Sequence, residues 1–342
     1  MKAFFYACFL FLTFHSQALP FSLNEKIAKG QPGDYIVTEK ENNFSLLLLR
    51  SQSSSLLVLE EISIPTVLFE SLATPSWRQW VEKGAPGHTS WTLFEINLEK
   101  GKLQESYSFS QRRWLSWDDS EPFLASVLFL PLEKLPPEQR KRIGPPPLSG
   151  EQDRRSLWSP TLVKEGKKMP KAQCEAFRSH WPEDNSHLSL CQIDLYFDSQ
   201  SPVFPFPFWI EVYNGHYSFK LPVVDSGSNL YSTFRGTIPH RPPFLMSSPQ
   251  LKEKELIFYL KSPSYYTAFH LFALDVTETP FKTISVPCRF EKTAQKEEIM
   301  LLVKKEDLKN LLEPHHEYRW SFIPENFSDV YAENNEIWTW KD

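Results

Sequence analysis

The stretch FWIEVYNGHYSFKLPVV, residues 208–224, carries the clearest local signal in the sequence. Two runs of β-branched and aromatic residues flank Asn214-Gly215, and Asn-Gly favours a type I′ hairpin turn because both residues tolerate positive φ. We therefore predict two antiparallel strands, Phe208 to Tyr213 and His216 to Val224. A third strand, Leu188 to Phe197, is expected to precede this hairpin.

The composition extends this reading to the whole chain. The 342 residues include 28 Pro and 11 Gly, whereas average usage has more Gly than Pro. Pro-rich loops between β-branched and aromatic runs predict a mainly β fold class. Hydrophobic residues make up 41% and aromatic residues 15% of the chain, which excludes intrinsic disorder for most of it.

The order of strand and turn signals divides the sequence into five segments. Thr74-Pro75 places a capping residue before a proline at the first helical position, and Gly84 supplies a stop, which predicts a helix from Pro75 to Lys83. The expected segments are a signal peptide (1–18), an N-terminal antiparallel β-sheet or barrel-like domain with that one short helix (19–130), a Pro-rich linker or surface-wrapping arm (131–172), a central β segment (173–247) and a C-terminal β-sandwich (248–342).

The N-terminus has the features of a secretory signal peptide. Lys2 supplies one positive charge, residues 3–14 are uncharged, and Ser16-Gln17-Ala18 offers the small residues that precede a cleavage site. The uncharged run is shorter than the roughly 20 residues of a membrane-spanning helix. We therefore predict cleavage after Ala18 and a periplasmic or secreted mature chain without a transmembrane span. An uncleaved N-terminal anchor is the alternative.

Removal of this signal peptide would leave three cysteines, Cys174, Cys191 and Cys288. In an oxidising compartment, Cys174 and Cys191 are predicted to form a disulfide because they are close in sequence, with unpaired thiols as the alternative. His180 and His187 lie between them, and two thiolates with two imidazoles are the ligand set of a structural zinc site. The short Cys-x2-4-Cys spacing of such sites is missing, so zinc stays a secondary interpretation and no cofactor is expected.

Four tryptophans are candidate binding residues. Trp77, Trp80, Trp114 and Trp117 could anchor a protein partner or stack on a glycan, since Trp is favoured at binding hot spots. Trp114 and Trp117 are the best exposed candidates because they lie between a strand end and the acidic turn Asp118-Asp119. The alternative is that all four fill small β cores.

The C-terminal region contains the pattern Leu312-x-Pro314-x-x-x-Tyr318-x-Trp320. This pattern resembles the tyrosine corner of immunoglobulin-like and fibronectin type III domains, in which a Tyr hydroxyl hydrogen-bonds to the backbone upstream. The resemblance covers residues 248–342 and implies an immunoglobulin-like sandwich. It implies nothing about function, because that fold hosts many functions. The sequence indicates no known family for the full chain.

Charge and motifs narrow the function classes. A net charge of -5 without a long basic cluster argues against nucleic acid as a partner, and the basic run Arg140-Lys141-Arg142 is interpreted as a solvated helix end. The sequence has no Gly-x-Ser-x-Gly elbow, Gly-rich phosphate loop or EF-hand pattern. We therefore expect an exported, non-enzymatic binding protein of the cell envelope or extracellular space, with a protein or glycan partner. The alternative is a secreted hydrolase acting on envelope or extracellular polymers.

Overall fold

The computed structural model divides the chain into two compact units, Met1–Gly236 and Thr237–Asp342, which we call the N-terminal and C-terminal units. The signal peptide predicted at residues 1–18 lies outside the residues that the structure describes. Among the described residues, no helix is both long and apolar enough to cross a membrane. The described residues are 21–72, 76–115, 127–150, 152–169, 172–184, 186–216, 218–233, 238–263, 265–277, 279–294, 297–327, 330–333 and 336–341.

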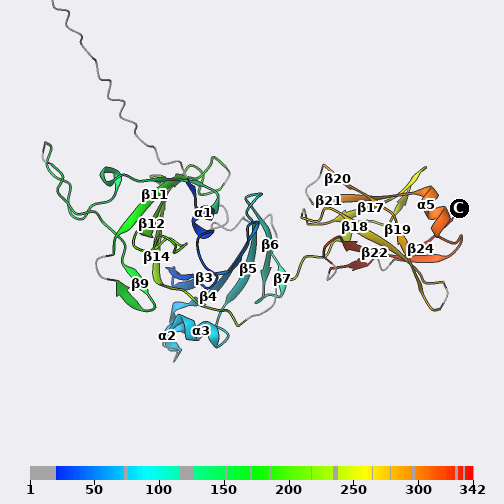
Figure 1. The fold of residues 1–342 in the computed structure, drawn as a ribbon, viewed down its shortest axis with the longest axis horizontal. Coiled ribbons are helices and arrows are strands. Elements are labelled where there is room, and N and C mark those ends of the chain that lie inside the picture. Colours follow the sequence, from blue (N-terminus) through cyan, green and yellow to red (C-terminus); the bar gives the residue numbers. More distant parts are fainter. Residues whose placement is uncertain are drawn as a thin grey trace, which may run out of the picture. The chain divides into compact units, whose positions relative to one another are not determined.

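A twelve-stranded antiparallel sheet forms the N-terminal unit (Figure 1). The strands follow the order β1-β8-β11-β12-β13-β14-β2-β3-β4-β5-β6-β7 across the sheet. Their bounds are β1 Phe21–Ser22, β2 Tyr35–Lys40, β3 Asn43–Gln52, β4 Leu56–Pro65, β5 Ser90–Asn97, β6 Lys102–Ser108, β7 Arg113–Trp114, β8 Pro131–Lys134, β11 Cys174–His180, β12 Gln192–Asp198, β13 Trp209–Tyr213 and β14 Ser218–Gly227.

The two strands of the hairpin predicted around Asn214-Gly215 are confirmed, but the type I′ turn is not. Tyr213 pairs with Ser218, so four residues rather than two connect the strands, and Asn214 does not have the positive φ that this turn requires. Gly215 adopts a φ of +87°, a conformation that glycine accepts without steric cost. Strand β14 is twice as long as β13, and its far half pairs with β2 after a bulge between Val223 and Asp225. This pairing joins strands from the expected segments 19–130 and 173–247 in one sheet, because an unpaired half-strand would leave its backbone groups exposed.

Helices cover both faces of this sheet, which curves around α1 (Leu23–Ile27) while α2 (Thr66–Ser71) and α3 (Trp77–Glu82) lie on the opposite face (Figure 1). Two residues of α1 are buried in one cluster with strand residues from both ends of the sheet, including Phe94 and Ile193. The N-cap of α3 is Ser76, whose hydroxyl accepts a hydrogen bond from the Gln79 N–H at 3.2 Å.

The segment between β8 and β11 returns across the sheet. It contains the 3-10 turn η1 (Pro137–Gln139), an antiparallel bridge between Arg142 and Leu157, and the hairpin β9 (Leu162–Lys164) and β10 (Lys167–Met169). Trp158 packs edge-on against Tyr196 and Trp209, with ring centroids 5.2 Å apart in both pairs. This segment, which we call the arm, therefore lies against β12 and β13.

The C-terminal unit consists of two antiparallel five-stranded sheets around a shared core. Phe258 from one sheet contacts Trp320 from the other, with ring centroids 4.9 Å apart. The structure thus confirms the mainly β fold class. The elements are β15 Phe244–Leu245, β16 Gln250–Leu251, β17 Glu255–Lys261, β18 Phe269–Asp275, β19 Lys282–Val286, β20 Arg289–Lys292, β21 Glu298–Lys304, α5 Lys305–Leu311, β22 Glu317–Pro324, β23 Ala332–Glu333 and β24 Trp338–Thr339.

Candidate functional site

Two of the tryptophans predicted for binding lie in the core. The side chain of Trp80 is 0% exposed, and its Nε1 donates to the Pro86 carbonyl at 3.0 Å. Trp77 stacks on Phe69 with ring centroids 3.7 Å apart and is 8% exposed. Neither ring is available to a partner, because α3 turns both toward the sheet. Both tryptophans therefore fill the core, as the alternative interpretation of the sequence predicts.

Of the other two tryptophans, the structure describes only Trp114. Trp114 lies in β7, half-buried, with its ring 5.6 Å from that of Tyr107 on the neighbouring strand. Trp117 lies outside the described residues. The structure therefore places Trp114 on the edge strand of the sheet and leaves the expected pair as a prediction.

The predicted disulfide between Cys174 and Cys191 is wrong, since both are free thiols. In the β11–β12 hairpin, Cys174 is opposite Asp198, whereas Cys191 accepts a backbone hydrogen bond from Trp181 at the other end. Seven residues of strand separate the levels of the two cysteines, about 23 Å at roughly 3.3 Å per residue, whereas a disulfide needs Cα atoms within about 7 Å.

The same separation prevents Cys174 and Cys191 from sharing a zinc ion. His180 and His187 are exposed, so their side chains do not converge with the buried thiols. Within the described ranges, no group of three or more His, Cys, Asp or Glu side chains could hold a metal ion.

Alkylation distinguishes unpaired thiols from a disulfide. Alkylation in denaturant without reductant is expected to modify Cys174, Cys191 and Cys288 completely, as measured by peptide mapping. In the native protein all three should react slowly, because burial raises the pKa of Cys174 and of Cys288 to about 11 and so suppresses the reactive thiolate. A peptide pair linked through Cys174 and Cys191 would contradict the structure.

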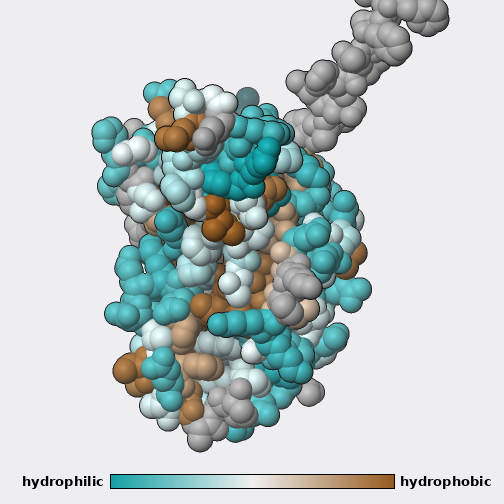
Figure 2. Space-filling model, turned by 90° about the vertical axis from the view of Figure 1, so that its left-hand side faces the viewer, coloured by the Kyte–Doolittle hydropathy of each residue, from teal (hydrophilic) through white to brown (hydrophobic). Residues whose placement is uncertain are grey.

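A pocket of about 460 Å³ lies where the arm meets the outer face of β11, β12 and β13. We call it the sheet-face pocket. Figure 2 views the molecule from the side of these strands, where hydrophobic residues appear as separate patches among hydrophilic ones. The pocket is lined by Gln139, Arg140, Lys141, Arg178, Asp194, Glu211, Tyr213, Gly215, His216 and Ser218.

Strand alternation gathers polar side chains on this face. Ile193 and Leu195 of β12 point to one side of the sheet, so Asp194 and Tyr196 point to the other. The strand register then places charged residues of four strands in one row across the sheet. This row is Arg178, Asp194, Glu211 and Lys220.

Both acidic residues of the pocket have internal cationic partners. Arg178 makes a bidentate pair with Asp194, with N–O distances of 2.8 and 2.9 Å, and Gln192 Nε2 donates to the same carboxylate at 3.0 Å. Lys141 of the arm pairs with Glu211. Because Asp194 is only 3% exposed, these contacts provide the compensation that a buried carboxylate requires.

Two polar groups beside these pairs are left without partners. Arg140 Nε and the Tyr196 hydroxyl are both buried and make no hydrogen bond to any described residue. Burial, together with the charges of Asp194 and Glu211, raises the pKa of Tyr196 to about 12, although the Arg140 guanidinium opposes this shift. The hydroxyl therefore stays protonated and able to donate.

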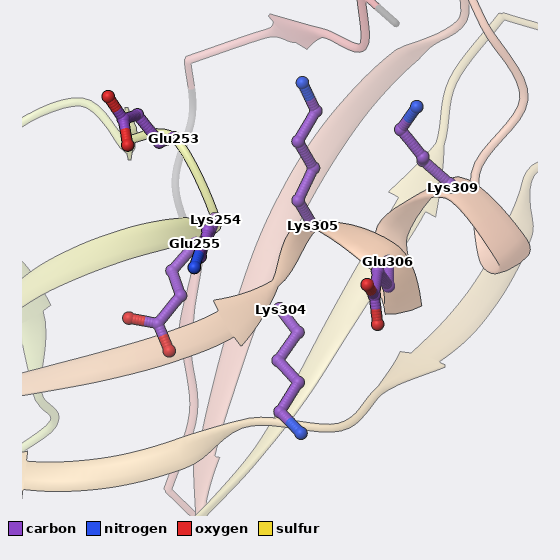
Figure 3. A pocket seen from close by; sticks show the side chains of 7 residues that line it. All are labelled: Glu253, Lys254, Glu255, Lys304, Lys305, Glu306 and Lys309. Carbon is purple, nitrogen blue, oxygen red and sulfur yellow. The ribbon is translucent and has the colours of Figure 1, made fainter.

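A second pocket, in the C-terminal unit, has about 500 Å³ and a lining of charged residues only. Figure 3 shows that these side chains diverge: Lys305 and Lys309 extend to one side, whereas Lys304 and Glu306 extend to the other. Lysine and glutamate alternate around it, and most are exposed. Its lining, Glu253, Lys254, Glu255, Lys304, Lys305, Glu306 and Lys309, is best described as a solvated face.

A third, smaller pocket of about 220 Å³ lies beside β9 and contains a serine next to a lysine. Lys164 Nζ is 2.9 Å from Ser201 Oγ and 2.8 Å from Asp198 Oδ2. Although burial opposes ionisation, hydrogen bonds from Lys164 and a backbone N–H lower the pKa of Asp198. Lys164 Nζ donates both hydrogen bonds, so in this arrangement it offers the serine no acceptor, as a general base would.

The fold and these sites define a two-unit antiparallel β protein with a charged pocket on its large sheet. Residues 45–170 match the family model described as CT021 protein. Among solved structures, the chain is similar to the 2.0 Å structure of the hypothetical protein CT021 from Chlamydia trachomatis. The TM-score is 0.47 and the identity 20%, over 65% of this chain and 100% of that chain. A comparison with curated proteins found no match.

The family match corrects the sequence-based recognition, which was wrong in two respects. A known family does match part of the chain, and it matches in the N-terminal unit rather than in residues 248–342. The assignment of those residues to immunoglobulin-like or fibronectin type III domains rested on one motif. The Tyr318 hydroxyl does accept a hydrogen bond from the Glu313 N–H at 2.7 Å, but a contact across five residues fixes only a local turn.

Proposed function

We propose that the chain is an exported, non-enzymatic binding protein of the cell envelope or extracellular space, and that the sheet-face pocket receives a group of its protein or glycan partner. The observation that carries this proposal is that Arg140, which lines a pocket of about 460 Å³, has a buried Nε without a hydrogen-bond partner among the described residues. The unpartnered Tyr196 hydroxyl is buried close to this arginine. Ligand pockets typically have about 300–1,000 Å³ and a few convergent polar groups. Export is supported by the signal-peptide pattern of residues 1–18.

Closing the pocket is expected to abolish binding without unfolding the chain. Ser218 is exposed at the pocket, so Ser218→Trp fills the space from a position that tolerates a large side chain. Ser110→Trp, at an exposed turn after β6, is the matched control. In a thermal-shift screen of envelope glycan fragments, a ligand at one hundred times its Kd stabilises by about 2.7 kcal/mol. Ligands should stabilise the wild type and Ser110→Trp, but not Ser218→Trp.

The outcomes of this screen separate the two function classes. Ligands that stabilise Ser218→Trp as strongly as the wild type would place binding elsewhere. No stabilising ligand, together with turnover of an envelope polymer that Ser201→Ala abolishes, would instead support the secreted hydrolase. Ser201 is the residue chosen for this test because the pocket beside β9 places its hydroxyl 2.9 Å from Lys164 Nζ.

A further inference from the structure

We infer that the group bound in the sheet-face pocket is an anion, a carboxylate or a phosphate, held by the guanidinium of Arg140, with the buried hydroxyl of Tyr196 close to that guanidinium. This inference rests on the proposed function, because it names the chemistry of the ligand for the same pocket. It follows from the charge balance, the hydrogen-bonding capacity and the surroundings of these two groups.

The charge balance of the pocket leaves Arg140 as its uncompensated cation. The carboxylates of Asp194 and Glu211 are engaged by Arg178 and Lys141, respectively. The side chain of Arg140 makes no ion pair or hydrogen bond within the part of the chain that the structure describes. A cationic ligand would therefore be repelled by Arg140 and would find both carboxylates already ion-paired. An anionic ligand could pair with the guanidinium of Arg140.

The unpartnered groups are also both donors. A guanidinium has five N–H donors and no acceptor, and its fork matches the two oxygens of a carboxylate or phosphate. The protonated hydroxyl of Tyr196, buried near Arg140, is a second unpartnered donor. A neutral sugar hydroxyl could accept one of these hydrogen bonds but would leave the charge of Arg140 unbalanced.

The surroundings strengthen an interaction with an anion. Tyr196 is 0% exposed, and Trp158 of the arm packs on it and on Trp209 of the next strand. These rings exclude water from the Tyr196 side chain, which is buried near Arg140, and a charge-assisted hydrogen bond is stronger where water is excluded.

Isothermal titration calorimetry of residues 19–342 at pH 7 tests the inference, with inorganic phosphate, glucuronate and glucose as probes. The variants are Arg140→Ala and Tyr196→Phe, with Arg154→Ala as a matched control because Arg154 is an exposed arginine of the same arm. We expect phosphate or glucuronate to bind and glucose not to bind. Loss of charge-assisted hydrogen bonds should weaken anion binding at least about tenfold in Arg140→Ala. Tyr196→Phe should weaken it less, and Arg154→Ala should leave it unchanged.

The two anions distinguish the source of the charge, since phosphate alone indicates a phosphorylated ligand and glucuronate alone an acidic glycan. Glucose binding as tightly as the anions, or an unchanged affinity in Arg140→Ala, would overturn the inference. If the anion results fail in this way but Ser218→Trp abolishes the binding of a neutral ligand, the proposed function survives and only the anion assignment fails. If no probe and no screened ligand depends on the pocket, both fail. Circular dichroism of each variant shows whether it is folded.

Discussion

Replacing Trp80 by alanine is expected to lower the free energy of unfolding of the N-terminal unit by about 3–5 kcal/mol, the usual range for a large aromatic side chain removed from a core. Trp80 is fully buried, and its ring lies 5.7 Å from Trp77 and 5.8 Å from Phe69. The substitution also leaves the Pro86 carbonyl without its indole donor. Urea unfolding followed by far-ultraviolet circular dichroism measures the loss.

Trp114→Ala is the control for Trp80→Ala, because it removes the same kind of side chain from the edge of the sheet. Trp114 is only half-buried on the short edge strand β7, so its removal should cost about 1 kcal/mol. Equal losses for the two variants would contradict the assignment of Trp80 to the core and of Trp114 to the edge of the sheet.

Glu95→Gln is expected to stabilise the protein by about 3 kcal/mol at pH 8, an effect that vanishes near pH 4. Glu95 faces Glu105 directly across β5 and β6, is 7% exposed, and its Oε2 is buried without a hydrogen-bond partner among the described residues. Burial, and then the charge of Glu105, raise the pKa of Glu95 to about 7.

The sign of this effect follows from the raised pKa. Below the unfolded pKa of about 4.5, Glu95 is protonated in both states and its contribution to stability is fully present. That contribution is lost as the pH rises through about 7, where the native state must ionise a buried carboxyl beside another acid. Glutamine stays neutral and removes this pH dependence. Glu99→Gln, at the exposed turn of the same hairpin, should leave the free energy of unfolding unchanged at both pH 4 and pH 8. An equal effect of Glu95→Gln at pH 4 and pH 8 would refute the explanation.

The sequence predicted best where the signal is local. Asn214-Gly215 indicates where the chain reverses, and the flanking strands pair as expected, although the connection is longer than the predicted type I′ turn. The pairing of β14 with β2 was not predicted, because it joins Val223 to Thr38 and no local pattern encodes which distant strand completes a sheet. The Tyr318 motif shows the same limit, since a local turn was taken as evidence for a whole domain.

The candidate site was predicted poorly for a related reason. Trp77, Trp80 and Val81 have the spacing of one helix face, a signal for the core that outweighs the general preference of Trp for interfaces. Arg140 was interpreted as a solvated helix end, and Tyr196 lies in another segment of the sequence. Alternation along β12 indicated that polar side chains share one face, but only the return of the arm brings a guanidinium to that face.

Crystal structures of the wild-type protein grown with inorganic phosphate and with glucuronate test the central claim most directly. We expect density for at least one of these anions in the sheet-face pocket, within hydrogen-bond distance of the guanidinium of Arg140. Anions bound only among the lysines around Lys305 and Lys309 of the C-terminal unit, with the pocket at Arg140 empty in both crystals, would contradict it.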